Sequence, residues 1–226
     1  MSFTKSKIAK MMDYALLKAQ TTNREIAAGA KLCAEAGIGC FCVRPTDVAN
    51  AVELLEKAKA KKTVVACVVS FPHGDSTTAT KIIETVEAIE DGAKEIDMVM
   101  NIGQFLSRKY SFVQRDIAAV TTAAHARGAL CKVIIETALL TPAQIRKASE
   151  IAVDAGADFI KTSTGFAGGG ATPEAVKIML EVADGTGVQV KASGGIGDFA
   201  TAVMYAEMGV ARLGVSGAAK ILGIGK

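Results

Sequence analysis

Eight short apolar runs, separated by longer segments with helical periodicity, constrain the fold of this chain most. The runs recur at spacings of roughly 25–35 residues, close to what about 250 residues divided among eight strand–helix units would give. Each has a strand-like length, and most are rich in Val, Ile and other apolar residues. The expected strands are 11–17, 38–43, 63–69, 95–100, 131–136, 159–163, 188–192 and 211–215. The first of these runs, 11–17, can also be interpreted as a helix.

The segments between the runs carry signals for the start and end of helices. Thr-Pro pairs at 141–142 and 172–173 are typical of an N-cap followed by the first helical position. Asp198 can cap a helix over 199–208, which Gly209 ends. These signals predict a helix after each of the expected strands 131–136, 159–163 and 188–192.

We therefore predict one α/β domain over residues 1–226, folded as a (β/α)₈ TIM barrel. A doubly wound open sheet is the rival architecture. That fold would usually show a glycine-rich turn after its first strand, and none follows Leu17.

Composition excludes several classes of protein. Half of the 226 residues are apolar and 22% are charged, which excludes a disordered chain. The net charge of +3 is too small and too dispersed for a nucleic-acid partner. No apolar run reaches the roughly 18 residues of a membrane helix, and the polar, basic N-terminal segment lacks the apolar core of a secretory signal. The odd number of cysteines, five, favours reduced thiols, so we expect a cytoplasmic protein.

Strand alternation places charged side chains in the interior of the predicted barrel, where Val, Ile and Leu are usual. The polar side chains expected inside are Glu95, Asp97, Lys132, Glu136, Lys161, Gln189 and Lys191, with Asp13 as a possible addition. Burying such charges is costly unless they pair. We assign Glu95, Lys132 and Gln189, near the strand starts, to structural pairing. Asp97, Lys161 and Lys191 lie late in their strands, where barrel active sites are built.

Two neighbouring lysines suggest a chemistry. A like charge and partial desolvation both lower the pKa of an amine, so that a free amine exists near neutral pH. Such an amine is a nucleophile that forms a Schiff base with a carbonyl. A carboxylate such as Asp97 can then orient the second lysine and move protons. If this hypothesis holds, the amines of Lys161 and Lys191 lie within about 8 Å, roughly a Debye length.

Glycine clusters follow the last three predicted strands and indicate an anion site. Gly165 and Gly168–Gly170 follow the strand of Lys161, Gly194 and Gly195 follow that of Lys191, and Gly214, Ser216 and Gly217 surround the end of the last strand. Backbone N–H groups there can approach a phosphate, helped by the N-terminus of the following helix. Barrels also commonly bind phosphate after strands seven and eight. Glycine is also common in plain turns.

Other chemistries find little support in the chain. The two histidines, His73 and His125, lie in separate segments, so we predict no metal site. Cys42 ends a strand and can face the site, but a small buried apolar residue is an equal interpretation.

Several motifs resemble the deoxyribose-phosphate aldolase family over nearly the whole chain. They are AGADFIKTSTGFAGGG, which ends at Gly170, CKVIIET at 131–137, EIDMVMNIG at 95–103, VKASGGI at 190–196 and RLGVSG at 212–217. They stand in the family's order. The resemblance implies a class I aldolase on a (β/α)₈ barrel that works without a metal or other cofactor. It would reversibly cleave 2-deoxy-D-ribose 5-phosphate to acetaldehyde and D-glyceraldehyde 3-phosphate.

The resemblance also implies residue roles. Lys161 would form the Schiff base, Lys191 would tune it, and Asp97 would relay protons. The residues around the substrate phosphate and sugar would be Thr164, Gly165, Gly194, Gly195 and Ser216. Asp13 matches an acidic residue of the family's first-strand motif, and Cys42 is a further candidate at the site. We also expect a homo-oligomer, either a dimer or a tetramer.

The chain departs from the family pattern at a few positions. Tyr14 and Ala15 stand in MDYALLK where the family often has DHTLLK, and Phe166 stands where some members have a basic residue. The alternatives are a Schiff-base barrel enzyme for another aldehyde or ketose phosphate, a barrel sugar-phosphate isomerase, and a non-catalytic sugar-phosphate-binding protein.

Overall fold

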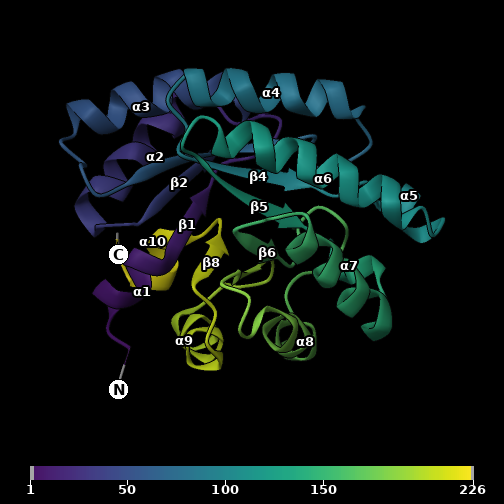
Figure 1. Ribbon diagram of the computed structural model, residues 1–226. Coiled ribbons are helices and arrows are strands. Elements are labelled where there is room, and N and C mark those ends of the chain that lie inside the picture. Colours follow the sequence, from purple (N-terminus) through teal and green to yellow (C-terminus); the bar gives the residue numbers. More distant parts are fainter. Residues whose placement is uncertain (1–2, 225–226) are drawn as a thin grey trace.

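Eight parallel strands close into a barrel in the computed structural model, which describes residues 3–224 (Figure 1). The strands are β1 (Met12–Ala15), β2 (Cys40–Val43), β3 (Val64–Val69), β4 (Glu95–Val99), β5 (Leu130–Ile134), β6 (Phe159–Lys161), β7 (Gln189–Ser193) and β8 (Arg212–Val215). Each strand pairs with its neighbour in sequence, and β1 also pairs with β8. This closure confirms the predicted (β/α)₈ barrel and excludes the open sheet, while residues 1–2 and 225–226 of the predicted domain lie outside the described residues.

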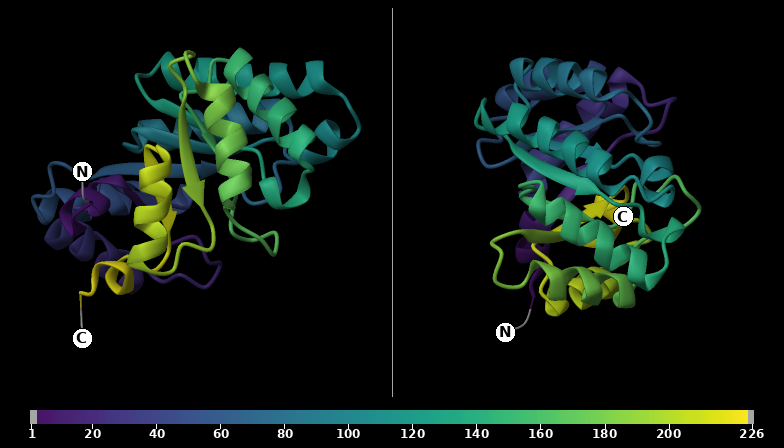
Figure 2. Two further views of the ribbon diagram at one scale, coloured as in Figure 1. Left: turned by 90° about the horizontal axis from the view of Figure 1, so that it is seen from below. Right: turned by 45° about the vertical axis from the view of Figure 1, so that its right-hand side comes forward.

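Helices follow every strand and cover the outside of the barrel (Figures 1 and 2). The α-helices are α1 (Lys5–Met11), α2 (Asn23–Ala36), α3 (Val48–Lys57), α4 (Thr78–Glu90), α5 (Ile102–Leu106), α6 (Tyr110–His125), α7 (Pro142–Asp154), α8 (Pro173–Ala183), α9 (Phe199–Met208) and α10 (Ala218–Leu222). The short 3₁₀ helices are η1 (Pro45–Asp47) and η2 (Thr137–Leu139). Because α1 contacts both α9 and α10, the first and last described helices lie on the same side of the barrel.

The predicted helix signals act as expected. The side chains of Thr141, Thr172 and Asp198 each accept a hydrogen bond from a backbone N–H in the first turn of α7, α8 and α9. Gly209 ends α9 in the left-handed region, at a φ of 104°.

All eight strands differ from their predicted bounds by one or two residues at one end or both. Two of these differences lie at β1 and β6. Met11 ends α1, so the ambiguous segment 11–17 is helix for one residue and strand only over Met12–Ala15. The strand β6 is shorter than 159–163: it ends at Lys161, and Thr162 and Ser163 bond to Ser193 at the end of β7.

The two faces of the strands pack differently. Side chains such as Ile96, Met98 and Val133 join the helices in one large apolar cluster outside the barrel. Inside, a small apolar cluster on β2 and β3 consists of Cys40, Cys42, Ala66 and Val68. The charged side chains of the other strands share the rest of the interior with apolar ones such as Phe159, whose ring lies near Lys132 and Arg212. All five cysteines are free and buried, and no helix within residues 3–224 is long and apolar enough to cross a membrane.

A buried ion pair joins α4 to α6 outside the barrel. Lys81 Nζ lies 2.6 Å from Asp116 Oδ2, and neither side chain is more than 1% exposed. Lys81 also donates to the carbonyl of Val99 at 3.0 Å, while the hydroxyl of Thr78 donates to Asp116 Oδ1 at 2.7 Å. The pair therefore fixes the end of β4 against two helices.

Removing one partner of this pair should be strongly destabilising. Asp116→Ala leaves the Lys81 ammonium buried and unpaired, which should lower the free energy of unfolding by about 3–5 kcal/mol. Adding Lys81→Met to that variant should recover most of the loss. Urea unfolding measures both effects. The exposed pair of Lys57 and Glu53 supplies the control, since Glu53→Ala should change stability by no more than about 1 kcal/mol. Equal costs for Asp116→Ala and Glu53→Ala would show that the buried pair does not support the fold.

Candidate active site

Seven charged side chains from six strands meet inside the barrel. We call them the charged network: Asp13, Glu95, Asp97, Lys132, Lys161, Lys191 and Arg212. Strand register explains their meeting, because Asp97 is level with Lys132 and Lys161 is level with Lys191. Side chains at the same level and on the same face of neighbouring strands are in contact distance.

Asp97 stands at the centre of the charged network. Its Oδ1 accepts a hydrogen bond from Lys132 at 2.7 Å, and its Oδ2 accepts from both Lys161 and Lys191 at 2.7 Å. The carboxylate is fully buried. Because the amines of Lys161 and Lys191 contact the same oxygen, they lie well within the predicted limit, and Asp97 points into the barrel as expected.

A second layer of pairs lies beneath Asp97, toward the strand starts. Asp13 accepts hydrogen bonds from Lys191 and, at 2.7 Å, from Arg212. Glu95 contacts Lys132 and Arg212, each at 2.6 Å. This confirms structural pairing for Glu95 and Lys132.

The sequence analysis missed Arg212 as a member of the charged network. It begins β8 and has the same strand parity as Gly214. Alternation along RLGV would have placed its side chain inside the barrel, as it did for the other strands.

The charged network gives its amines opposite shifts. Burial lowers the pKa of Lys161, and the ammonium of Lys191 lowers it further, against the opposing effect of Asp97. For Lys132 and Lys191, burial also works to lower the pKa, but the carboxylates of Asp13 and Asp97 outweigh it and raise the pKa of both. Although burial works to raise the pKa of Asp97, the three lysines hold it well below its usual range. Lys161 is therefore the amine of this group that loses its proton most readily.

A pocket of about 440 Å³ opens above the charged network, at the carboxyl ends of the strands. Its lining contains nine of the ten predicted site residues: Asp13, Cys42, Lys161, Thr164, Gly165, Lys191, Gly194, Gly195 and Ser216. Asp97, the tenth, lies directly beneath, in contact with the two lysines. The structure thus brings the sequence-predicted residues together in one place.

Four residues on three loops line this pocket and have backbone N–H groups without a partner in the described part of the chain. Those of Gly165, Gly194, Gly195 and Ser216 make no hydrogen bond to any residue between 3 and 224. The three glycines have φ between 78° and 84°, which turns their peptide groups as other residues rarely can. Gly168–Gly170 do not line this pocket, which corrects the prediction for that cluster. A Cβ on Gly170 would lie 2.4 Å from the backbone of Gly194, so that glycine serves the packing of two loops.

Thr164 lines the pocket, yet its donors are already used. Its N–H donates to Glu136 Oε2 at 3.2 Å, and its hydroxyl donates to the same oxygen. Glu136 is buried just past the end of β5, with a φ of 57°. Strand alternation placed it among the charged side chains of the barrel interior, but it lies outside the charged network. Gln189 is exposed at the start of β7, so the assignment of this residue to interior pairing was wrong.

Cys42 is fully buried at the pocket floor. Burial raises the pKa of its thiol to about 11, and Asp97 adds to this shift. The side chain is therefore a protonated thiol near neutral pH, a poor nucleophile and a poor metal ligand.

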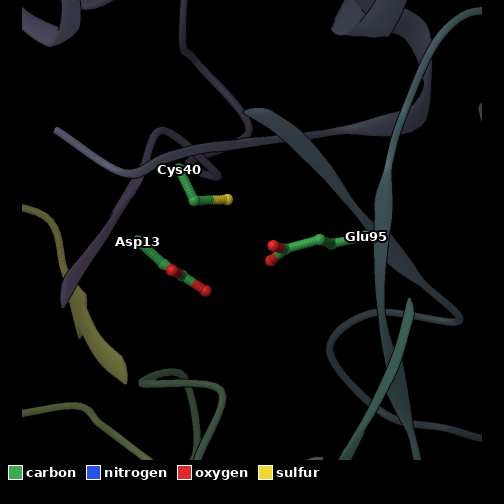
Figure 3. Close-up of side chains that lie close together, drawn as sticks. All are labelled: Asp13, Cys40 and Glu95. Carbon is green, nitrogen blue, oxygen red and sulfur yellow. The ribbon is translucent and has the colours of Figure 1, made fainter. Parts of the chain in front are cut away.

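Asp13, Cys40 and Glu95 extend into the same space from β1, β2 and β4 (Figure 3). Their ligand atoms lie within 4.8 Å of one another, as those of a metal site would. Lys132 and Arg212, however, already contact both carboxylates. Burial, together with these carboxylates, raises the pKa of the Cys40 thiol well above its ordinary value. The protein's own cations thus satisfy these carboxylates, and the donor set does not fit a metal ion.

Comparisons with known proteins agree with this geometry. The family model of DeoC/LacD family aldolases matches residues 7–222. A deoxyribose-phosphate aldolase of Halalkalibacterium halodurans is 48% identical over 218 residues, which cover 95% of this chain and 94% of that protein. The deoxyribose-phosphate aldolase of Geobacillus sp. is 46% identical over 218 residues, with the same coverage.

Solved structures share the barrel. An aldolase named QR15 has a TM-score of 0.89 and 42% identity, covering 96% of this chain and 94% of its own. A deoxyribose phosphate aldolase of Aeropyrum pernix, described as tetrameric, has a TM-score of 0.89 and 29% identity, covering 97% of this chain and 91% of its own. The barrel, the paired lysines at its mouth and the family match over residues 7–222 together show that the chain belongs to the DeoC/LacD family of aldolases.

Proposed function

We propose that this protein is a deoxyribose-phosphate aldolase. It reversibly cleaves 2-deoxy-D-ribose 5-phosphate to acetaldehyde and D-glyceraldehyde 3-phosphate through a lysine Schiff base. The observation that carries the proposal is the position of Lys161. Its amine lies at the floor of the pocket, has a lowered pKa, and contacts the carboxylate that also holds Lys191. The 45–48% identity to deoxyribose-phosphate aldolases supports the choice of substrate.

The first half of the proposed reaction forms the electron sink. The neutral amine of Lys161 attacks the aldehyde carbon of the open-chain sugar, and loss of water gives a protonated Schiff base. Removal of the proton from the substrate's C3 hydroxyl then breaks the adjoining carbon–carbon bond. The electron pair of that bond enters the iminium group, which becomes an enamine, and glyceraldehyde 3-phosphate leaves.

The second half restores the amine. The enamine takes a proton at carbon, and water hydrolyses the resulting Schiff base to acetaldehyde and free Lys161. Asp97 contacts both amines, so we assign it, with Lys191 and bridging water, to the proton relay. The protonated imine serves as the electron sink, so the proposed reaction needs no metal or other cofactor.

We assign the substrate phosphate to the loops after β6, β7 and β8. The free N–H groups of Gly165, Gly194, Gly195 and Ser216 line the pocket there and are suited to an anion. Thr164 acts in this proposal through its bonds to Glu136, which hold the loop that presents Gly165. Asp13 and Cys42 form the floor beneath the substrate.

We also propose a cytoplasmic homo-oligomer, either a dimer or a tetramer. Five free, buried thiols support a reducing compartment. The tetrameric description of the Aeropyrum pernix relative supports self-association.

Reductive trapping tests the proposed reaction. Borohydride added with 2-deoxy-D-ribose 5-phosphate should attach the sugar-derived carbon chain to Lys161, and peptide mass mapping identifies the labelled residue. Asp97→Asn should still trap substrate while its turnover falls about 10²–10⁴-fold, because it loses the proton relay. A label on Lys191 alone would reverse the roles of the two lysines, and no label on either would exclude the Schiff base.

Steady-state kinetics test the phosphate assignment. Gly195→Ala forces an L-residue to a φ of 78° and adds a methyl group to a residue that lines the pocket. The Michaelis constant should rise at least about tenfold for the phosphorylated sugar and much less for 2-deoxyribose. Gly187 has a φ of 83° in the turn before β7, so Gly187→Ala imposes the same strain away from the pocket and should change neither constant. Equal effects of Gly195→Ala on both sugars would contradict a phosphate site there.

The pH dependence of lysine modification tests the tuning of Lys161. Lys191→Leu removes a neighbouring positive charge and leaves Asp97 to interact more with Lys161, and both changes raise the pKa of Lys161. An amine-directed reagent reacts with the neutral form, so inactivation accelerates as the pH rises through this pKa. The inactivation profile of Lys191→Leu should therefore shift to higher pH than that of the unaltered protein. An unchanged or acid-shifted profile would rule out this role for Lys191.

A further inference from the structure

Arg44, which directly follows β2, binds a loop that belongs to another strand. Its Nη1 donates to the carbonyls of Lys18 at 3.1 Å and Ala19 at 3.0 Å, and its Nη2 donates to the carbonyl of Thr21 at 3.0 Å. Its Nε donates to Asp47 at 2.7 Å, which fixes the guanidinium itself. One planar group therefore determines the path of the loop between β1 and α2.

That loop forms one wall of the pocket. Leu16, Leu17, Lys18 and Thr21 line the pocket, whereas Arg44 does not. The three carbonyl oxygens that bind Arg44 are thus paired with a guanidinium that does not line the pocket. Because β1 is paired with β8, this wall adjoins Ser216, where we place the phosphate.

Lys18 supplies a positive charge to this wall. It is exposed, lines the pocket and forms no ion pair within 4.0 Å among residues 3–224. The other two lysines of the pocket, Lys161 and Lys191, are both held by Asp97. Lys18 is therefore the pocket lysine that is available for a substrate anion.

Glu25 is the neighbouring group that opposes this role. It also lines the pocket, and Lys18 lies near enough for its charge to act on the carboxylate. Its Oε2, however, accepts hydrogen bonds from the N–H and hydroxyl of Thr22, the N-cap of α2, which fix Glu25 in a capping box. The carboxylate is thereby bound to the start of the helix, while the exposed amine of Lys18 has no ion-pair partner among residues 3–224.

We propose that Lys18 binds the phosphate of the substrate from the β1 side of the pocket, and that Arg44 is the positioning residue that holds Lys18 there. The inference deepens the proposed function and rests on it. An arginine is required for the positioning role, because three carbonyls in different directions need a planar fork of N–H groups, which a lysine lacks. Asp47 completes the arrangement by orienting that fork.

The test compares phosphorylated and unphosphorylated substrate. Lys18→Met should raise the Michaelis constant for 2-deoxy-D-ribose 5-phosphate about tenfold, leave kcat within about twofold, and leave kinetics with 2-deoxyribose nearly unchanged. Arg44→Met should produce the same pattern, and the double variant should be no worse than the single ones, because both act through one contact. Glu25→Gln, which keeps an acceptor for Thr22, should lower the Michaelis constant for the phosphorylated sugar.

Further variants separate positioning from stability. Arg44→Lys keeps the charge but should match Arg44→Met in its effect on the Michaelis constant. Lys31→Met on α2 and Arg146→Met on α7 remove exposed ion pairs away from the pocket and should change nothing. Thermal unfolding identifies any variant that fails to fold. If Arg44→Met fails to fold, the Michaelis constant of Arg44→Lys tests the positioning role instead. Equal losses with both sugars, or single effects that multiply in the double variant, would overturn the proposal.

Phosphate binding makes the test independent of the reaction. If the unaltered protein cleaves neither sugar, the proposed function fails, but calorimetric titration with inorganic phosphate still tests the inference. Binding that weakens about tenfold in Lys18→Met and in Arg44→Met, but not in Lys31→Met, would support it. Phosphate affinity that is equal in all of these proteins would refute it.

Discussion

The interior of this barrel depends on one carboxylate shared by three lysines. Asp97 binds Lys132 through one oxygen and both Lys161 and Lys191 through the other, at the same 2.7 Å. A buried carboxylate is tolerated only when its charge is compensated, and a buried ammonium has the same requirement. Removing Asp97 would therefore leave Lys161 without a carboxylate partner, whereas Lys132 would keep Asp13 and Glu95, and Lys191 would keep Asp13.

The charge balance of the network indicates which amine loses its proton most readily. The charged network contains four basic side chains and three carboxylates. With every group ionised it carries one excess positive charge in a region shielded from water, and with one amine neutral it is balanced. Lys132, Lys191 and Arg212 each have a pKa above the ordinary value, and Lys161 has a pKa below it. Lys161 is therefore the member whose deprotonation would balance the network most readily, and it also lines the pocket and holds the fewest carboxylate contacts.

Much of this arrangement was predictable from strand alternation. The parity of residues in β4, β6 and β7 placed Asp97, Lys161 and Lys191 inside one barrel mouth, and the apolar partners Ile96 and Met98 outside it. The Thr and Asp caps of α7, α8 and α9 were also predictable from the sequence, because capping is a local interaction between residues three apart.

The remaining features depend on where each strand begins and ends, and on contacts between segments far apart in the chain. Gln189 has the parity of an interior residue but begins its strand, where the barrel opens to solvent. Glu136 lies past the end of β5, and its positive φ turns it toward Thr164 instead of the charged network. Arg44 binds a loop some 25 residues earlier in the chain. No local pattern encodes that pairing, because only the closure of β1 against β2 brings the loop within reach.

The same charge count bears on the proposed reaction. Attack by neutral Lys161 starts from a balanced network, and formation of the protonated Schiff base takes up one proton from solvent, which adds one positive charge next to Asp97. In a buried site such a charge is costly, so the network favours any step that removes it. Carbon–carbon cleavage is that step once the relay has passed the hydroxyl proton through water to solvent, because the electron pair of the broken bond neutralises the iminium and leaves an uncharged enamine. Under the proposed mechanism, the surplus of one base over the carboxylates therefore acts twice. It provides the free amine before the reaction and strengthens the electron sink during it.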